Sequence, residues 1–236
     1  MFYFMDVNRK VRKQLRSFIN NQAMSINYAR LECLAKVPIE FIGERVLEVG
    51  SGAGLLSDFF IRRGALLTIT DGRPELVSIA RQIYGANSLV EAIFTLDLDH
   101  LEDLDNSSID SPYDWIFAFG LIYHLSDPKS ALEYLASICK KGILIETVIT
   151  SESVSPTKVL ERSDFNQAVN FGSRASLNFY LEILRSLFPF IYLPEEPEHR
   201  EYKGKNPERV VIIASHQELN YSIPSSNVIT VKDLRI

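Results

Sequence analysis

The stretch that most constrains the fold is residues 45–57, Arg-Val-Leu-Glu-Val-Gly-Ser-Gly-Ala-Gly-Leu-Leu-Ser. It begins as a short apolar strand, passes through closely spaced glycines and ends in residues that suit the first turn of a helix. Glycine adopts positive φ readily and leaves backbone N–H groups accessible. Gly50, Gly52 and Gly54 therefore predict a tight turn on which a small molecule lies.

Two residues beside this turn narrow the class of ligand that it is expected to bind. A dinucleotide-binding turn has glycine or alanine five positions after its first glycine, where this chain has Leu55. Glu48, two residues before Gly50, would repel a pyrophosphate and attract an ammonium group. The pattern favours a ligand with an amino acid end over a nicotinamide cofactor.

At these residues, Glu-x-Gly-x-Gly-x-Gly, the chain resembles the class I S-adenosylmethionine-dependent methyltransferases. The resemblance covers residues 42–149 and extends by analogy to residue 215. It implies that the turn, including Ser51, holds the methionine part of S-adenosylmethionine. It also implies an α/β three-layer sandwich: a mostly parallel seven-stranded sheet closed by an antiparallel C-terminal strand, preceded by N-terminal helices.

Composition supports an ordinary globular domain. The 236 residues are 46% hydrophobic and 23% charged, enough for one full core, and the net charge of −5 argues against nucleic-acid binding by bulk electrostatics. Cys33 and Cys139 have no Cys-x-x-Cys partners, so we expect no disulfide framework and no metal site. No stretch approaches the ~20 apolar residues of a membrane span. We therefore expect a cytoplasmic protein without a secretion signal.

Two helices are expected at residues 7–22 and 25–40, within an N-terminal cap of residues 1–41. The first carries a basic cluster that is read as a solvated helix face, with an anionic substrate or RNA as the alternative partner: Arg9, Lys10, Arg12, Lys13 and Arg16. In the second, Arg30 is a candidate partner of the methionine carboxylate, the alternative being a surface ion pair.

Strands and helices alternate after the glycine turn. Apolar runs predict strands at 66–70, 92–96, 113–119 and 142–149, with helices at 74–84 and 128–140. Pro74 and Pro128 stand at the first turn of the two helices, a position that suits proline. This alternation predicts a parallel sheet with helices on both faces, and ligands bind beyond the carboxyl ends of such strands.

Residues after the second and third expected strands are candidates for holding the rest of the cofactor. Asp71 stands about twenty residues after Gly50, where a carboxylate accepts from ribose hydroxyls. The alternative is a cap for the helix at residues 74–84. Gly72 would leave space for the adenine, and Arg73 would stack its planar guanidinium on the base.

The adenine amino group has two candidate partners. The resemblance implies that Asp97 accepts from this group while the backbone N–H of Leu98 contacts a ring nitrogen. Asp99 is the competing carboxylate. Asp97 is preferred because it directly follows the apolar run 92–96.

The exit of the fourth expected strand is the candidate reaction site. Gly120 would let the chain pass close to the methyl group, and Tyr123 would orient the substrate or simply pack. His124 is either a general base for a hydroxyl acceptor or a structural hydrogen-bonding residue. The exit lacks the Asn/Asp-Pro-Pro-aromatic pattern of many amino-methylating enzymes, so oxygen acceptors are favoured.

Residues 150–173 are expected to form a lid over the acceptor, with Asn166, Asn170 and Arg174 as possible contacts, the alternative being a disordered segment. Ser173 is expected to cap a helix that runs to about residue 188. Two closing strands at 190–193 and 209–214 would complete a methyltransferase domain of residues 42–215. A tail of residues 216–236 would then serve as a linker or interface strand, with a fused or partner domain beyond it.

These expectations define a function. The chain is predicted to be an S-adenosylmethionine-dependent O-methyltransferase that acts on a small molecule or on the carboxyl end of a peptide-like natural product. A carboxylate is ionised at neutral pH and needs no base, so both acceptors stay open. An RNA-modifying methyltransferase and a non-catalytic S-adenosylmethionine-binding partner protein are the alternatives.

Overall fold

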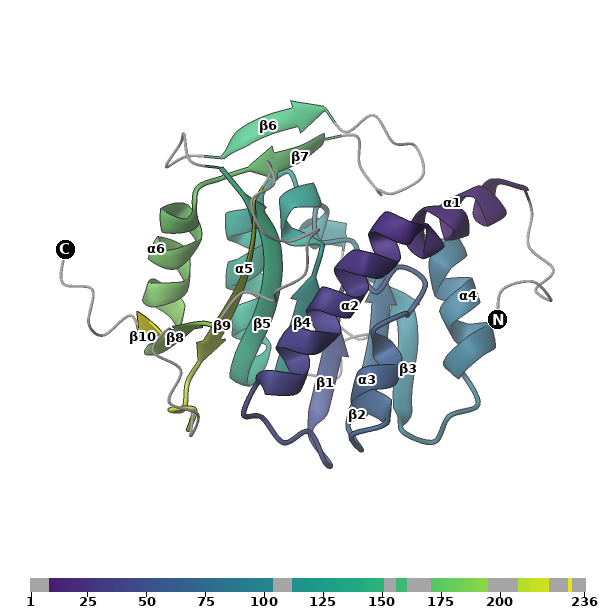
Figure 1. The fold of residues 1–236 in the computed structure, drawn as a ribbon, viewed down its shortest axis with the longest axis horizontal. Helices are drawn as coiled ribbons and strands as arrows, with labels where there is room; N and C mark the ends of the chain where they lie inside the picture. Colours follow the sequence, from purple (N-terminus) through teal and green to yellow (C-terminus); the bar gives the residue numbers. More distant parts are fainter. Residues whose placement is uncertain are drawn as a thin grey trace.

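A computed structural model describes residues 9–103, 112–150, 156–160, 171–194, 208–220 and 229–230. The predicted mostly parallel sheet is confirmed, in the strand order β10-β8-β9-β5-β4-β1-β2-β3 (Figure 1). Strands β1 to β5 and β8 run in one direction, and β9 and the two-residue β10 run against them. The strands are β1 (Arg45–Glu48), β2 (Leu66–Asp71), β3 (Val90–Thr95), β4 (Tyr113–Phe119), β5 (Cys139–Ile149), β8 (Phe190–Leu193), β9 (Glu208–Ser215) and β10 (Ile229–Thr230).

Helices cover both faces of this sheet. They are α1 (Arg9–Ile19), α2 (Asn21–Lys36), α3 (Ser57–Ile61), α4 (Pro74–Tyr84), α5 (Pro128–Ser137) and α6 (Leu177–Leu187), with short 3-10 turns η2 (Leu101–Asp103) and η4 (Ile122–His124). The second helix begins earlier than predicted because Asn20 caps it, its side chain accepting from Ala23 N at 2.9 Å. Pro74 and Pro128 start their helices as predicted.

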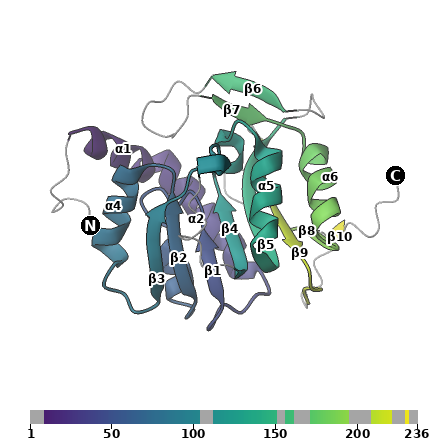
Figure 2. The ribbon, with the colours of Figure 1, turned by 180° about the vertical axis from the view of Figure 1, so that it is seen from behind.

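Strand β4 shows how one apolar run builds the two halves of the core. Trp115 and Phe117 pack in the cluster that includes α2, α3 and α4. Ile116 and Ala118 point the other way, into the cluster with α5 and α6. Because successive side chains of a strand alternate between faces, a strand apolar on both faces must lie between two helical layers. Figures 1 and 2 show these layers from opposite sides.

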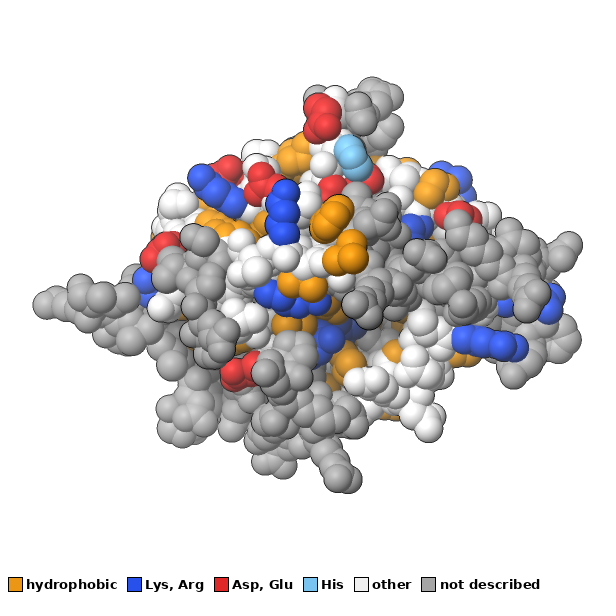
Figure 3. Space-filling model, turned by 90° about the horizontal axis from the view of Figure 1, so that it is seen from above, with side chains coloured by type: hydrophobic (Ala, Val, Ile, Leu, Met, Phe, Trp, Pro, Cys, Tyr) orange, Lys and Arg blue, Asp and Glu red, His pale blue; other side chains and the backbone are white. Residues whose placement is uncertain are grey.

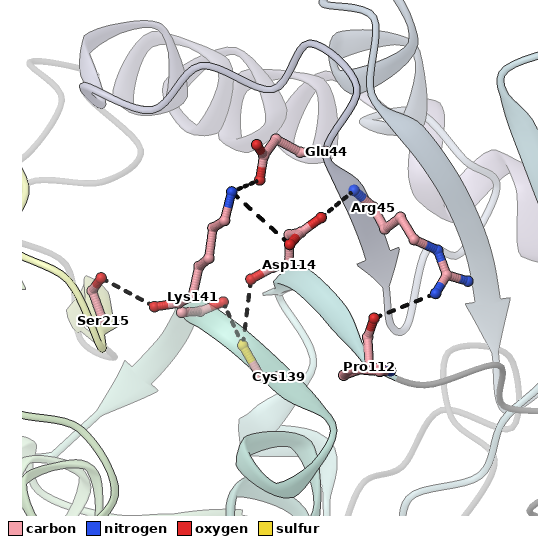
Figure 4. Close-up of polar contacts among 8 residues, drawn as sticks. Glu44, Arg45, Pro112, Asp114, Cys139, Lys141 and Ser215 are labelled. Carbon is pink, nitrogen blue, oxygen red and sulfur yellow. Dashed lines mark hydrogen bonds and ion pairs between the residues drawn. The ribbon is translucent and has the colours of Figure 1, made fainter.

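A polar network closes the edge of the sheet where the central strands begin (Figure 4). Lys141 on β5 pairs with Glu44 and lies 3.9 Å from Asp114 Oδ1. The other oxygen of Asp114 accepts from Arg45 N at 2.9 Å, which ties β4 to β1. Lys141 thus lies between two carboxylates at this edge, and the cavity opens at the opposite edge of the sheet.

The region after β5 corrects one prediction. Ser173 does not cap the following helix, because it lies in β7 (Phe171–Arg174), which pairs with β6 (Thr157–Leu160) as a two-stranded hairpin. The cap is Ser176, whose hydroxyl accepts from Phe179 N at 3.3 Å. Both serines precede the helix in sequence, and only the strand pairing separates their roles.

The hairpin stands above the carboxyl end of the sheet in Figure 1, on the side where the lid was predicted. Asn166 and Asn170, the predicted lid contacts, lie outside the described residues. At the other end of the chain, Ile229 and Thr230 pair with β8, which places this part of the predicted tail at the sheet edge. Across the described residues, no helix combines the length and apolar character needed to cross a membrane.

Candidate functional site

A cavity of about 400 Å³ opens at the carboxyl ends of the strands. Its wall combines the residues after β1, β2, β3 and β4 with side chains from α1, α2 and β9. Figure 3 looks down on this face, and Lys and Arg side chains lie among hydrophobic ones near its middle. The predicted site residues that line the cavity are Glu48, Gly50, Ser51, Asp71, Gly72, Arg73, Asp97, Leu98, Gly120 and His124.

The glycine turn has the geometry that the sequence predicted. Gly50, Gly52 and Gly54 have φ values of 67°, 58° and 70°. The N–H of Ser51 donates to Thr70 O at 2.9 Å, and that of Gly52 donates to Asp71 Oδ2 at 2.8 Å. These two donors are therefore engaged with β2, and a phosphate would have to displace these bonds to use them.

Glu48 is buried at the end of β1, where its carboxylate accepts from the Ser57 hydroxyl. Burial raises the pKa of Glu48 to about 7, the Ser57 hydrogen bond opposes this, and the charge of Asp71 adds to it. The carboxyl is consequently near its titration midpoint at neutral pH. A cation bound beside it would favour the ionised form.

Asp71 is buried and fully hydrogen-bonded. Its Oδ1 accepts from Arg73 N at 3.0 Å and Arg73 Nε at 2.8 Å, and its Oδ2 accepts from Gly52 N and, at 2.9 Å, from the Arg73 guanidinium. A carboxylate has about four acceptor positions, so these bonds occupy it. A ribose would have to replace the Arg73 side chain to reach Asp71.

Arg73 is bound to Asp71 in this structure, and its stacking on the adenine stays a prediction. Its guanidinium folds back on Asp71 and sits 5.5 Å from the ring centroid of Phe18. Phe18 comes from α1 and also covers the glycine turn, since a Cβ added to Gly52 would lie 2.7 Å from its ring. Phe18 has no distinctive signal in the sequence, because it is one aromatic residue in a basic amphipathic helix.

Asp97 and Asp99 both line the cavity but have different partners. Asp99 Oδ1 accepts from the N–H and hydroxyl of Ser126 at 2.7 and 2.8 Å, which ties it to the loop after β4. Asp97 Oδ2 lies 3.0 Å from Nδ1 of the exposed His100, and this contact raises the pKa of His100. A ligand can replace an exposed histidine more readily than it can replace the Ser126 loop.

A buried ion triad borders the other side of the cavity. Glu146, fully buried on β5, binds Arg30 of α2 at 2.7 Å and Arg209 of β9 at 2.8 Å. Burial by itself would raise the pKa of Glu146, but the two guanidinium groups lower it to about 2, so the carboxylate stays ionised. The triad excludes the alternative of a surface ion pair for Arg30, whose side chain is 13% exposed.

Gly120 makes room for this triad. It has a φ of 74°, and a Cβ at this position would lie 2.2 Å from a guanidinium nitrogen of Arg30. Its N–H donates to Glu146 O at 3.0 Å. In this structure Arg30 therefore fills the space that a side chain at Gly120 would take, and the approach of a methyl group to Gly120 stays a prediction.

Tyr123 and His124 follow on η4, with their ring centroids 4.1 Å apart. Arg174 donates to Tyr123 O at 2.8 Å and to Ser173 O at 2.9 Å, and its guanidinium lies 5.1 Å from the Tyr123 ring centroid. Arg209 lies 5.4 Å from the same ring. Arg174, a predicted substrate contact, thus supports the backbone that carries the two aromatic side chains.

Sequence reasoning missed Glu146 and Arg209. Glu146 is the one carboxylate within the apolar run 142–149, and a charge in a strand buried on both faces requires a partner. That signal was available. Arg209, the partner of Glu146, was not foreseeable, because this pairing depends on β9 lying antiparallel to β5.

Together, the sheet order and the cavity at the carboxyl edge define a Rossmann-like α/β protein with a small-molecule site. The sequence profile of a family described as "Methyltransferase domain" matches residues 7–191. The chain belongs to this methyltransferase domain family.

Curated relatives include two named ubiquinone biosynthesis O-methyltransferase. The protein from Xylella fastidiosa strain 9a5c is 34% identical over 119 residues, which is 50% of this chain and 46% of the relative. The protein from Xanthomonas euvesicatoria pv. vesicatoria is 35% identical over 118 residues, covering 50% and 47%. The match thus spans about half the length of these relatives.

Solved structures share the fold at low sequence identity. The N-terminal domain of EvdMO1, crystallised in the presence of SAH and D-fucose, has a TM-score of 0.58 and 19% identity, covering 90% of this chain and 85% of that one. Magnesium protoporphyrin IX methyltransferase from Synechocystis PCC 6803, with bound SAM, has a TM-score of 0.56 and 16% identity, covering 91% and 88%. These likenesses establish the fold.

Proposed function

We propose that this protein binds S-adenosylmethionine in the cavity and transfers its methyl group to an oxygen atom of a small molecule or of the carboxyl end of a peptide-like product. The observation that carries the proposal is the row of carboxylates Glu48, Asp71 and Asp97, which lie at the carboxyl ends of three neighbouring strands at one cavity wall. Family membership and relatives named as O-methyltransferases support it.

The row of carboxylates matches the hydrogen-bond donors of the cofactor in order. Glu48 would face the amino group of the methionine part, and Asp71 the ribose hydroxyls once Arg73 has moved aside. Asp97 and the N–H of Leu98 would bind the adenine, with Gly72 beside it. Asp97 is preferred over Asp99 because Ser126 already engages Asp99.

The methionine carboxylate would lie toward Arg30. This guanidinium borders the cavity next to Gly120, and its buried Nε has no hydrogen-bond partner among the described residues. A buried donor without an acceptor costs about 1–3 kcal/mol, which an incoming carboxylate would relieve. The cofactor would then span from Arg30 and Glu48 to Asp97.

The acceptor would enter beside Tyr123 and His124. Methyl transfer forms a bond between the acceptor oxygen and the methyl carbon while the carbon–sulfur bond breaks and S-adenosylhomocysteine leaves. Positioning and exclusion of water supply much of the rate enhancement. With a hydroxyl acceptor, His124 would take the proton, and a carboxylate acceptor would need no base.

Calorimetry tests the cofactor site directly. S-adenosylmethionine and S-adenosylhomocysteine should bind, whereas NAD should not. Asp71→Ala should weaken S-adenosylhomocysteine binding by about 1.5–3 kcal/mol through the lost ribose hydrogen bonds. Asp58→Ala, which removes an exposed carboxylate of α3, is the matched control and should bind like the wild type. No binding of either adenosyl ligand would refute the proposal, and a screen for labelled methyl transfer into metabolite extracts would identify the acceptor.

A further inference from the structure

The charges that line the cavity are separated along the sheet. The acidic side chains lie at the carboxyl ends of β1, β2 and β3, namely Glu48, Asp71, Asp97 and Asp99. Arg73 lies in this half as well, but Asp71 neutralises it. In the other half, formed by β4, β5 and β9, the charged side chains lining the described cavity are Arg30 and Arg209, with His124 beside them.

In this basic half, the two guanidinium groups that line the described cavity, Arg30 and Arg209, both bind Glu146. Two positive charges thus share one negative charge within this triad. A methionine carboxylate at Arg30 would balance the triad, and the sulfonium of S-adenosylmethionine would then add one positive charge. Buried positive charge without a counter-ion is unfavourable, so this half is suited to an anion.

Arg209 is the guanidinium best placed to receive that anion. One of its terminal nitrogens binds Glu146 at 2.8 Å, which fixes the orientation of the planar group. The other lies 3.5 Å from the Tyr123 hydroxyl, at the limit of a hydrogen bond, and Arg209 itself lines the cavity. Glu146 raises the pKa of Arg209 by its charge and hydrogen bond against the opposing effect of burial, so the side chain stays cationic.

We infer that Arg209, together with the Tyr123 hydroxyl, binds a carboxylate group of the methyl acceptor and thereby selects anionic acceptors. The inference rests on the proposed function, since it assigns the acceptor side of the same cavity. If the triad had only a structural role, one arginine would be enough to neutralise Glu146. The second arginine lines the cavity, and its outer nitrogen has the Tyr123 hydroxyl at 3.5 Å as its hydrogen-bond partner, so a planar carboxylate suits it as a ligand.

Matched acid and amide probes test this inference without knowledge of the natural acceptor. Benzoate and benzamide, and hexanoate and hexanamide, have nearly the same shape and differ in charge. Their binding to the protein saturated with S-adenosylhomocysteine can be measured by ligand-observed NMR. The wild type should bind each acid at least tenfold more tightly than its amide.

Three variants locate the effect. Arg209→Gln should bring the acid-to-amide ratio to within about twofold of one, and Arg209→Lys should keep part of the preference because it keeps the charge. Arg185→Gln on α6, which removes an arginine that does not line the cavity, should leave the ratio unchanged. S-adenosylhomocysteine affinity and the melting temperature of each variant show whether it is folded. If Arg209→Gln does not fold, the comparison of the lysine variant with the wild type still decides the point.

The two proposals fail in different ways. If the wild type does not bind S-adenosylhomocysteine, the proposed function is refuted. If it binds S-adenosylhomocysteine but binds neither acid at least tenfold more tightly than its amide, or if Arg209→Gln and Arg209→Lys both keep the full preference, the assignment of Arg209 is refuted and the proposed function stands.

Discussion

We expect the raised pKa of Glu48 to make cofactor binding pH-dependent. Burial holds this pKa at about 7, compared with a usual value of 4.5. If only the ionised carboxylate holds the ammonium group of the methionine part, about one molecule in ten is competent at pH 6 and about nine in ten at pH 8. The dissociation constant for S-adenosylhomocysteine should therefore fall about tenfold from pH 6 to pH 8, or about 1.4 kcal/mol.

Calorimetry at pH 6, 7 and 8 measures this change. At pH 7, binding should release about half a proton, which titrations in buffers of different ionisation enthalpy detect. Glu48→Gln should bind more weakly at pH 8 and show a flat profile. Glu32→Gln, which removes an exposed carboxylate of α2 paired with Lys36, should keep the wild-type profile. A flat wild-type profile, or an unchanged slope in Glu48→Gln, would refute the reasoning.

The raised pKa of Glu48 also makes the free energy of unfolding pH-dependent, with a sign opposite to that of cofactor binding. Between pH 4.5 and about 7 the folded protein keeps the Glu48 proton, whereas the unfolded chain has lost it. The contribution of Glu48 to the free energy of unfolding therefore decreases as pH rises through this window and is constant above it. Comparing the pH dependence of unfolding in the wild type and Glu48→Gln isolates this contribution.

Three further predictions follow from the cavity wall. Gly120→Ala should lower the free energy of unfolding by more than about 2 kcal/mol in urea denaturation, because positive φ is strained for alanine and its Cβ meets Arg30. Gly43→Ala, at a φ of 72° with open space beside it, should lower the free energy of unfolding by the backbone strain alone. Equal losses of stability in the two variants would disprove the collision with Arg30. His124→Ala should lower kcat about 100-fold with a hydroxyl acceptor, and near-full turnover would exclude a general base. Arg73→Ala should bind S-adenosylhomocysteine at least as tightly as the wild type in calorimetry, because Arg73 occupies Asp71; binding weakened more than threefold would instead support stacking on the adenine.

Local sequence determined much of the fold because its signals act over short distances. The glycines at 50, 52 and 54 set their own backbone conformation, and Pro74 and Pro128 mark their helix starts. The alternation of apolar runs and helical segments requires a parallel sheet. The candidate residues at the ends of β1, β2 and β3 follow from that sheet, since parallel strands end at the same edge.

The tertiary structure decided what these residues contact. Asp71 binds Arg73, and Gly120 leaves room for Arg30, because side chains distant in space could not be paired by spacing alone. The pKa of Glu48 depends on burial, which exists only in the folded core.

The basic half of the cavity is the clearest case. Arg30, Glu146 and Arg209 are separated by more than sixty residues at each step and meet only because β9 pairs antiparallel with β5 beneath α2. The sequence by itself determined a glycine turn and a row of carboxylates at one edge of the sheet. Only the packing of distant strands created the positively charged wall, because charge neutralisation depends on which side chains the fold brings together.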